Sequence, residues 1–399
     1  MADKKPNDAV ILSACRTAIG AYQGGLSPLT ATQMGALVVR EAVSRSGVDS
    51  QTIDEVIMGQ VVQAGSGQAP ARQAAIHGGI PSGVPCMTIN KVCGSGLKAV
   101  MLAAQSIRAG DQNLIVAGGM ESMSNTPFVL HGAKKGLRFG DQTLKDTMVL
   151  DGLWDSFNDF HMGSAAELTA RKSNISRGEQ DEYAAQSHAK AVAAVTGCAF
   201  KAQIVPVSIA QRKGDPVVFE KDECPRPDTT VASLAKLRPA FEKDGTVTAG
   251  NAPGLNDGAS AVVVASRKAA ESGGHKPLAR IVDYAAAGTD PELLFYAPID
   301  AVRKLCQKMN VGIDHFDLIE ANEAFAVQCI ADGRELGWDW NRVNVNGGAI
   351  ALGHPIGASG ARILTTLIYA LKDRGLKTGL ATLCLGGGNA LALAIELES

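Results

Sequence analysis

Two features that would place this sequence in a membrane or on nucleic acid are missing from it. No apolar run in its 399 residues approaches the ~20 residues that a membrane-spanning helix needs. Lys and Arg together number 38 against 40 Asp and Glu, which gives a formal net charge of −2. This balance gives no electrostatic reason to expect nucleic acid or an anionic membrane as a partner.

The sequence also lacks the cysteine patterns of zinc sites and redox motifs. It has no Cys-x-x-Cys pair and no cluster of cysteine and histidine at zinc spacing. We therefore expect no bound metal, and we expect most thiols to be reduced and buried as small apolar side chains. The eight cysteines lie at positions 15, 86, 93, 198, 224, 306, 329 and 384.

A targeting segment is absent as well. Residues 1–8 read Met-Ala-Asp-Lys-Lys-Pro-Asn-Asp and lead directly into an apolar run at 9–12. They contain neither the apolar core and cleavage site of a secretion signal nor an Arg- and Ser-rich presequence. We expect the protein to be cytoplasmic.

What the sequence does contain is a regular alternation of short apolar strands and helical patterns at both ends. The length suggests roughly two to three domains, and the alternation predicts an α/β layer architecture. In the first part we expect strands at 10–13, 55–58, 88–89 and 114–117, and helices at 32–46, 69–77 and 96–109. In the last part we expect strands at 279–284, 316–320 and 379–385, and helices at 299–309, 325–336 and 361–374.

The two ends resemble each other, whereas the middle differs. In each half a Ser-Gly pair, at 95–96 and at 359–360, opens a helix, and the following strand runs into glycines at 118–119 and 386–388. This is weak internal symmetry and indicates a duplicated α/β unit. Residues 120–256 are more charged, carry several prolines and include a helical pattern at 179–195, so we interpret them as an insertion. The segment 259–265 then supplies the last strand of the first unit.

Cys93 is the best candidate for a nucleophile. It lies in Asn90-Lys-Val-Cys-Gly-Ser-Gly96, between an expected strand and an expected helix. A thiol at a helix N-terminus is close to exposed amides, which lower its pKa and favour the thiolate. The glycines leave backbone N–H groups beside the sulfur, as an oxyanion hole requires. The alternative is a buried cysteine in a tight turn.

Two further reactive groups lie in glycine-rich loops near the C-terminus. His354 is in Gly353-His-Pro-Ile-Gly-Ala-Ser-Gly, and Cys384 precedes three glycines. The loop lacks the Lys-Ser/Thr ending and the preceding strand of phosphate-binding motifs, which excludes that interpretation. A second thiol exceeds what a cysteine hydrolase needs and suggests a second proton transfer. The segment Asn322-Glu-Ala-Phe325 either orients water or an oxyanion, or only caps a helix.

Together these motifs resemble those of the thiolase family, most closely its biosynthetic, acetoacetyl-CoA branch. The resemblance covers nearly the whole chain in the same order and includes His161-Met-Gly and Lys236-Leu-Arg-Pro-Ala-Phe. It implies two duplicated mixed-sheet α/β units stacked in five αβαβα layers, with an inserted loop domain. The N-terminal unit would comprise 1–122 and 257–277, the loop domain 123–256, and the C-terminal unit 278–399.

The resemblance also implies a reversible Claisen condensation of two acetyl-CoA molecules to acetoacetyl-CoA and CoA. Cys93 would take the first acyl group, His354 would activate it, and Cys384 would remove the α-proton of the second acetyl-CoA. Asn322, through a water, would form one oxyanion site with His354. The N–H groups of Cys93 and Gly386 would form the other. CoA is then substrate and product, and neither a metal nor another cofactor is implied.

The resemblance assigns the CoA and substrate contacts mainly to the loop domain. His161 and Met162 would flank the pantetheine, Arg226 would lie near the adenine, and Ser233 would lie along the chain. The expected contact residues are His161, Met162, Arg226, Ser233, Ala249, Phe325 and Leu294. A loop at 136–153 resembles the segment that forms tetramers in the family, so a homotetramer, a dimer of dimers, is expected, with a dimer as the alternative.

Two departures from the family pattern concern the substrate. Pro253 stands where a serine usually binds the pantetheine, and the bulky run 294–296 stands where the family has a Met-Gly pair. A 3-ketoacyl-CoA thiolase with longer or broader chain preference, acting in fatty-acid degradation, is therefore the alternative function. A ketoacyl synthase is disfavoured, because such enzymes have a second histidine in place of Asn322 and lack Cys384. A non-catalytic acyl-CoA-binding relative is disfavoured by the three intact reactive residues.

Overall fold

A computed structural model describes residues 5–398. Residues 1–4 and residue 399 lie outside the described residues. The expected absence of a targeting segment and the expected start of the N-terminal unit concern residues 1–4. The expected end of the C-terminal unit concerns residue 399. The fold is built on one large mixed sheet. Its strands run in the order β4-β3-β5-β13-β1-β14-β17-β16-β15.

The sheet consists of two halves with the same pairing pattern. Each half is parallel at its outer edge and antiparallel toward the middle. The halves meet through a short pairing of β1 with β14, at Val10 with Arg280 and Ile11 with Ala279. The first half comprises β4 (Cys86–Ile89), β3 (Glu55–Gly59), β5 (Leu114–Ser122), β13 (Asn256–Ser266) and β1 (Ala9–Thr17). The second comprises β14 (Ala279–Gly288), β17 (Asn389–Leu397), β16 (Thr378–Leu385) and β15 (Leu318–Ala321).

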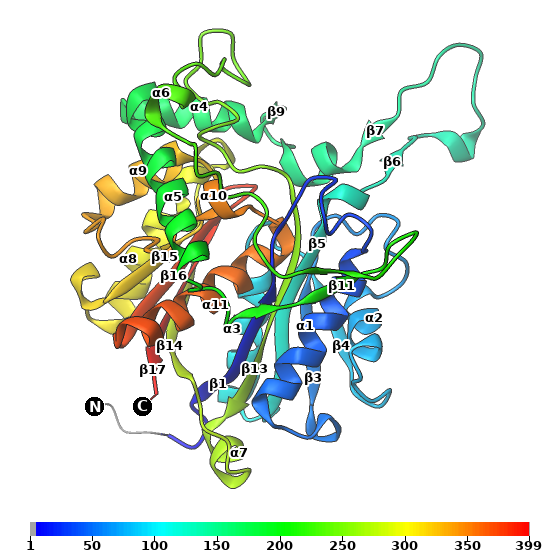
Figure 1. Ribbon diagram of the computed structural model, residues 1–399, viewed down its shortest axis with the longest axis vertical. Helices are drawn as coiled ribbons and strands as arrows, with labels where there is room; N and C mark the ends of the chain where they lie inside the picture. Colours follow the sequence, from blue (N-terminus) through cyan, green and yellow to red (C-terminus); the bar gives the residue numbers. More distant parts are fainter. Residues whose placement is uncertain (1–4, 399) are drawn as a thin grey trace.

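Helices cover the outer faces of both halves, and two helices lie between them. In Figure 1 the blue and cyan elements of the first half lie on one side and the yellow to red elements of the second half on the other. The helices α1 (Ala31–Ser46) and α2 (Pro70–His77) contact the first half, and α8 (Ala297–Met309) contacts the second. Helices α3 (Ser95–Ala109) and α11 (Ile356–Arg374) pack against each other and contact strands of both halves. Almost every residue of α11 is buried, as expected for a helix that is apolar or small on all sides.

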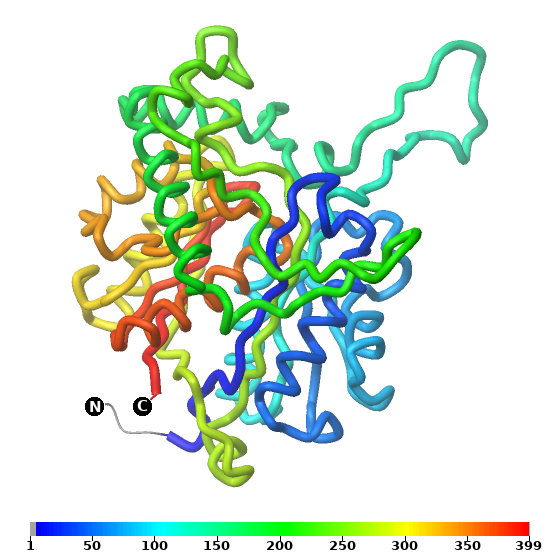
Figure 2. The backbone as a smooth tube through the Cα atoms, viewed as in Figure 1, coloured from blue at the N-terminus to red at the C-terminus, as the bar shows by residue number. Residues whose placement is uncertain are grey.

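The chain between β5 and β13 builds a separate layer of helices and loops above the sheet. Its helices are α4 (Met162–Ser173), α5 (Arg177–Thr196) and α6 (Val231–Leu234), and α9 (Ala326–Leu336) and α10 (Ala349–Leu352) of the second half pack beneath them. A hairpin of β6 (Phe128–Val129) and β7 (Lys145–Asp146) projects away from the body, as Figure 2 shows. The remaining short elements are β2 (Gly20–Ala21), β8 (Trp154–Asp155), β9 (Phe160–His161), β10 (Ile204–Val205), β11 (Val207–Ile209), β12 (Val217–Phe219) and α7 (Arg267–Ser272).

Some predicted element ends were wrong, and close packing explains why. Strand β5 does not stop at Gly118 but continues to Ser122. A Cβ at Gly119 would lie 2.0 Å from the carbonyl oxygen of Gly357, so the glycine lets the first turn of α11 reach the strand. Helix α11 likewise begins at Ile356, five residues before its predicted start, because the small residues of that segment are helical and pack against α3. The glycines mark close contact between elements rather than the ends of elements.

Membrane-spanning helices and metal sites were not expected from the sequence. Among residues 5–398 no helix is long and apolar enough to cross a membrane, and no group of three acidic, cysteine or histidine side chains is arranged to hold a metal ion. All eight cysteines are free. The expectation that most are buried was wrong, since only Cys15, Cys329 and Cys384 are fully buried. Several others lie at element edges: Cys86 is on the edge strand β4, and Cys198 follows α5 and is exposed.

Candidate active site

A cavity of about 420 Å³ opens between the two halves of the fold and the helical layer above them. Its floor contains Cys93, His354, Cys384 and Gly386, which come from three separate segments: the turn before α3, the loop before α11 and the end of β16. Its walls are mainly apolar and belong to the segments 149–162, 240–255 and 294–325. The sequence motifs that were separated by up to three hundred residues therefore meet in one enclosed space.

Cys93 sits in a tight turn before helix α3. Its neighbour Val92 has a φ of 47°, a left-handed conformation that is strained for a β-branched residue. Side chains at both ends hold this turn: Asn90 Oδ1 accepts from the N–H of Val92 over 2.9 Å. Ser95 Oγ accepts from the N–H of Lys91 at 2.8 Å and donates to the carbonyl of Val92 at 2.7 Å. The strain is thus fixed by hydrogen bonds, and the thiol is directed into the cavity.

The prediction of a lowered thiol pKa was wrong for Cys93. Burial raises the pKa of the Cys93 thiol to about 12, although the amides of Cys93 and Gly386 donate toward the sulfur and partly oppose the shift. Cys93 directly precedes Gly94, the N-cap of α3, but the effect of burial on its pKa exceeds the opposing effect of these amides. The resting thiol is therefore protonated and needs a base. The same two amides are those expected to form an oxyanion hole.

His354 is held in one tautomer by its neighbours. Its Nδ1 lies 2.6 Å from Ser359 Oγ, and this hydroxyl donates its single proton to the carbonyl of Pro355 at 2.9 Å. Nδ1 must then carry the ring proton and donate to Ser359, which leaves Nε2 as an acceptor. The backbone N–H of His354 donates to Asn256 Oδ1 at 2.8 Å and fixes the loop. Burial, reinforced by the charge of Arg362, lowers the pKa of His354 to about 3.

Asn322 lies behind His354 rather than in the cavity wall. It is fully buried, and its Nδ2 is 3.5 Å from Nε2 of His354. The alternative that it caps a helix is wrong, since the N-cap of α9 is Phe325 and no side chain bonds to that helix end. The Nδ2 group of Asn322 points toward the imidazole. It can also donate to a water molecule on the cavity side of His354 and orient that water.

Cys384 is the next-to-last residue of strand β16 and is buried on the floor of the cavity. Burial, and next the charge of neighbouring Cys93, raise the pKa of the Cys384 thiol well above its usual value. Both thiols line the same cavity. Gly387 and Gly388, both with a φ of 78°, turn the chain so that the Gly386 amide points back to Cys93.

Models of two protein families match almost the whole chain. The N-terminal domain of thiolase matches residues 9–268, and the C-terminal domain of thiolase matches residues 275–397. The chain belongs to the thiolase family. Its mixed α/β fold accordingly consists of an N-terminal and a C-terminal thiolase domain.

Curated relatives and a solved structure agree with this assignment. The acetyl-CoA acetyltransferase of Pseudomonas aeruginosa is 56% identical, and the match covers 98% of this thiolase and 100% of the relative. The acetyl-CoA acetyltransferase of Cupriavidus necator is 54% identical over 98% of this chain and 99% of the relative. The crystal structure of the Bacillus anthracis acetyl-CoA acetyltransferase has a TM-score of 0.96 and 44% identity, with 98% and 99% of the chains covered.

Most, but not all, of the expected substrate contacts of this thiolase line the cavity. The residues that do are His161, Met162, Ala249, Phe325 and Leu294. His161 caps helix α4 by accepting from the N–H of Gly163 at 3.0 Å, and its ring stacks on Phe241 at 4.9 Å. Arg226 and Ser233 are exposed and lie outside the cavity lining. The hydroxyl of Ser233 takes part in the capping box of α6 with Thr230.

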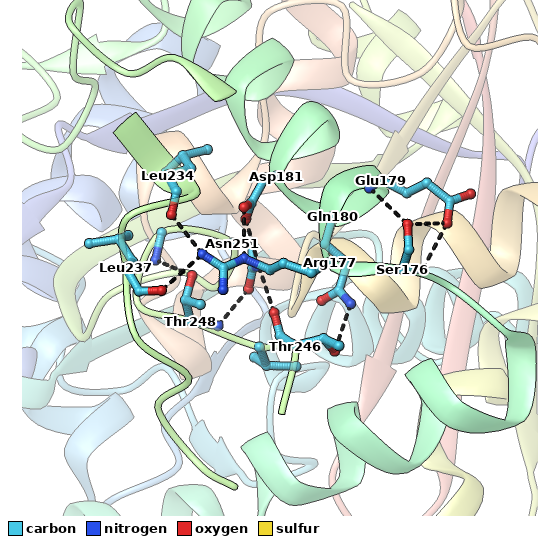
Figure 3. Close-up of polar contacts among 12 residues, drawn as sticks. Ser176, Arg177, Glu179, Gln180, Asp181, Leu234, Leu237, Thr246, Thr248 and Asn251 are labelled. Carbon is cyan, nitrogen blue, oxygen red and sulfur yellow. Dashed lines mark hydrogen bonds and ion pairs between the residues drawn. The ribbon is translucent and has the colours of Figure 1, made fainter. Parts of the chain in front are cut away.

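The wall that carries Ala249 is fixed to helix α5 by a polar cluster, shown in Figure 3. Asn251 is its centre: Nδ2 donates to Asp181 Oδ1 at 3.0 Å and to the carbonyl of Thr246 at 3.1 Å, and Oδ1 accepts from the N–H of Thr248 at 2.8 Å. Arg177 bonds to Asp181 and to the carbonyls of Leu234 and Leu237, which end and follow α6. This cluster joins the cavity wall, α5 and the segment of Ser233 into one rigid unit.

The two sequence departures differ in their position. Pro253 lines the cavity, as do Leu294 and Phe295 of the 3₁₀ helix at Pro291–Tyr296. Tyr296 points away, and its hydroxyl lies 2.6 Å from Ser173 Oγ on α4. Phe295 meets Phe325 edge to face at 5.3 Å. Leu294 and Phe295 are therefore the residues of the run 294–296 that reduce the space in the cavity.

Several residues of the site were missed by sequence reasoning. Ser359 and Arg362 lie on α11 next to the histidine loop, and a search for partners of His354 within one or two helical turns could have found them. Asn256, which anchors the backbone of His354, and Phe241, which stacks on His161, lie far away in the sequence. Phe241 ends the motif quoted above at 236–241, although no role was predicted for it. Nothing in the local pattern of Asn256 distinguishes it from an ordinary loop residue.

Proposed function

We propose that this thiolase is an acetyl-CoA C-acetyltransferase, which converts two acetyl-CoA molecules to acetoacetyl-CoA and CoA and also catalyses the reverse reaction. The observation that carries the proposal is the meeting of two thiols, one imidazole and the Gly386 amide in one cavity. The names of relatives more than half identical over nearly the whole chain give the same activity. The geometry supports each step of the reaction, as follows.

In the first step Cys93 takes the acetyl group. Nε2 of His354, an acceptor in the tautomer argued above, removes the thiol proton as the sulfur attacks the thioester carbonyl of acetyl-CoA. The carbon–sulfur bond to CoA then breaks, and the CoA thiolate leaves with the proton from His354. The amides of Cys93 and Gly386 stabilise the negative charge on the thioester oxygen. Proton removal coupled to attack suits a thiol whose pKa burial raises to about 12.

In the second step Cys384 acts as the base. The Cys384 thiol, protonated at rest because burial raises its pKa, first gives its proton to Nε2 of His354. The Cys384 thiolate then removes an α-proton from the second acetyl-CoA, and the resulting carbanion attacks the acetyl-Cys93 carbonyl. The bond between that carbonyl and Cys93 breaks, which releases acetoacetyl-CoA. The Cys93 sulfur then takes the proton held by His354, which restores both thiols and the neutral imidazole. Asn322, through a water, and His354 stabilise the enolate oxygen. His354 thus removes the proton of the Cys93 thiol, and Cys384 removes the α-proton of the second acetyl-CoA.

The CoA contacts extend this proposal into the layer between β5 and β13. His161, Met162, Ala249, Phe325 and Leu294 would surround the pantetheine end and the acyl group, in agreement with their place on the cavity wall. Outside the cavity, Arg226 would lie near the adenine and Ser233 along the pantetheine chain, and both are exposed and accessible there. CoA would be substrate and product, with no further cofactor.

The finer architecture is part of the same proposal. We assign 1–122 with 257–277 to the N-terminal unit, 123–256 to an inserted loop domain and 278–399 to the C-terminal unit. The units would stack in five αβαβα layers, and the contacts of α3 and α11 with strands of both halves support this stacking. The projecting hairpin with exposed Leu137, Phe139 and Leu144 supports a homotetramer. Eight free cysteines support a reducing, cytoplasmic location.

A chain-length assay tests the substrate part of this proposal. We expect thiolysis of acetoacetyl-CoA to exceed thiolysis of 3-ketohexanoyl-CoA and longer substrates in kcat/KM, because Leu294 and Phe295 occupy the wall beside Cys384. Replacing Leu294 with Ala should raise the rate on 3-ketohexanoyl-CoA relative to acetoacetyl-CoA. Equal or higher rates of the unmodified enzyme on long chains would favour a 3-ketoacyl-CoA thiolase of fatty-acid degradation instead.

A further inference from the structure

A buried cation lies directly behind Asn322 and outside the cavity lining. Arg362 is on α11, and its side chain is 2% exposed. Its Nη2 donates to Oδ1 of Asn322 over 3.4 Å, while Nη1 lies 4.0 Å from Oε2 of Glu320. In the part of the chain that the structure describes, Nε and Nη1 of Arg362 have no hydrogen-bond partner. Burial of a guanidinium costs free energy of folding. The hydrogen bond from Arg362 to Asn322 therefore suggests a functional reason for keeping the cation there.

The chemistry of the two groups fixes how the amide must lie. A guanidinium only donates hydrogen bonds, so the oxygen of Asn322 is the only end that can favourably face Arg362. The Nδ2 group then points the other way, to Nε2 of His354 at 3.5 Å. A flipped amide would place an NH₂ group against a cation and an oxygen against the lone pair of the imidazole. Both ends would become unfavourable.

Helix α11 therefore holds both parts of the oxyanion site. Ser359 accepts from Nδ1 of His354, and Arg362, three residues later on the same face, donates to Asn322. Glu320 is in β15 and Asn322 directly follows that strand, and the side chains of both approach Arg362. The imidazole and the amide are thus oriented from one rigid element, as preorganised donors require.

We propose that Arg362 is a positioning residue for acetyl transfer: it holds the Asn322 amide in the orientation that presents N–H donors toward His354 and the reacting oxygen. Glu320 supplies the neighbouring acidic group. Arg362 itself contacts neither substrate nor the reacting sulfur. The inference rests on the proposed function, since it assigns the reason for the residue to the same reaction.

The first test compares Arg362→Met with Arg362→Lys in thiolysis of acetoacetyl-CoA. Loss of an oriented donor lowers kcat rather than substrate binding. We expect Arg362→Met to lower kcat by about tenfold or more while each KM changes by less than about threefold. Arg362→Lys keeps a charge that prefers the amide oxygen and should recover part of kcat. A change in KM alone, or Lys and Met variants that are equally impaired, would contradict positioning by charge.

The second test is a double-mutant cycle with Asn322→Ala, with thermal melting of every variant as the folding control. If Arg362 acts through Asn322, Arg362→Met should lower kcat by less than about twofold once Asn322 is already Ala. A full loss in that background would overturn the proposal. If Arg362→Met does not fold, the cycle with Arg362→Lys gives the same comparison. Absence of thiolysis by the unmodified enzyme would instead contradict the proposed function, whatever Arg362 does.

Discussion

Burial moves the pKa values of the two central residues away from each other. It raises the pKa of Cys93 to about 12 and lowers that of His354 to about 3. Both groups are therefore neutral at rest near pH 7. The thiolate forms only when a thioester carbonyl can accept the sulfur and the Gly386 amide can stabilise the oxygen. The site keeps its nucleophile protonated until substrate excludes water from it.

The shifted pKa of His354 also affects stability. Because the folded pKa lies below the ordinary value of 6.5, the unfolded chain binds more protons between pH 6.5 and about 3. This contribution to stability is present above pH 6.5 and is lost as the pH falls toward 3. We expect the melting temperature to fall less between pH 7 and pH 5 in His354→Gln than in the unmodified enzyme, measured by calorimetry. The exposed His315→Gln is the control and should behave as the unmodified enzyme.

Cys384 and Cys93 have separable roles in this account. Cys384→Ala leaves the nucleophile and its base in place but removes the base for the α-proton. We expect this variant to be acetylated at Cys93 by acetyl-CoA, while its condensation rate falls by about a thousandfold or more. Mass spectrometry of the intact chain and formation of acetoacetyl-CoA measure the two steps. Loss of acetylation in a correctly folded Cys384→Ala would show that the second thiol also serves the first step.

At the scale of elements, glycines determine how closely helix α11 meets strand β5. A Cβ on Gly119 would lie 2.0 Å from the carbonyl oxygen of Gly357, a backbone atom that cannot rotate away. The loop of His354 immediately precedes this contact. Packing of α11 on β5 and the position of the catalytic imidazole are therefore coupled.

Because of this close contact, we expect a methyl group at position 119 to lower the free energy of unfolding. Gly119→Ala should destabilise the protein by about 1–3 kcal/mol or more, because backbone must shift to relieve the overlap. Gly83→Ala is the matched control, since a Cβ there meets no atom within 4 Å. Chemical denaturation of both variants measures the difference. Equal stability of the two variants would show that the contact between β5 and α11 is looser than these distances indicate.

Glycine also explains which parts of the site the sequence could predict. Cys93, His354 and Cys384 were identified because each stands in an unusual run of small residues, a local signal. The ends of β5 and α11 were wrong for the same reason, since glycine that permits close contact looks like glycine that ends an element. Asn256 and Phe241 reach the site only through long-range packing. Phe241 stands in the motif at 236–241, but that motif does not show its contact with His161, and no local pattern could have predicted Asn256.

At the scale of the whole molecule, the site is divided between the two halves and the projecting hairpin stands apart from it. Cys93 belongs to the first half, whereas His354 and Cys384 belong to the second. The duplication predicted from the Ser-Gly pairs therefore places one reactive loop from each half on a common cavity. Assembly of the halves creates the chemistry, and neither half contains it alone.

The exposed apolar side chains of the β6–β7 hairpin allow a test of the proposed tetramer. Phe139 is fully exposed and Leu144 is 59% exposed, which is typical of a contact between copies of the chain. We expect Phe139→Asp to convert a tetramer to dimers in light scattering after size exclusion. Val218→Asp, an exposed position on the separate β11–β12 hairpin, should leave the mass unchanged. An unchanged tetramer in the Phe139 variant would assign the assembly to another surface.

The proposed reaction depends on transfer of the acetyl group to Cys93, and covalent labelling measures this transfer. After incubation with acetyl-CoA carrying a radioactive acetyl group, the denatured enzyme should retain about one label per chain on the peptide that contains Cys93. Cys93→Ala, shown to be folded by its melting curve, should retain none. Label retained by the Cys93→Ala chain, or found on Cys384 in the unmodified enzyme, would contradict the account.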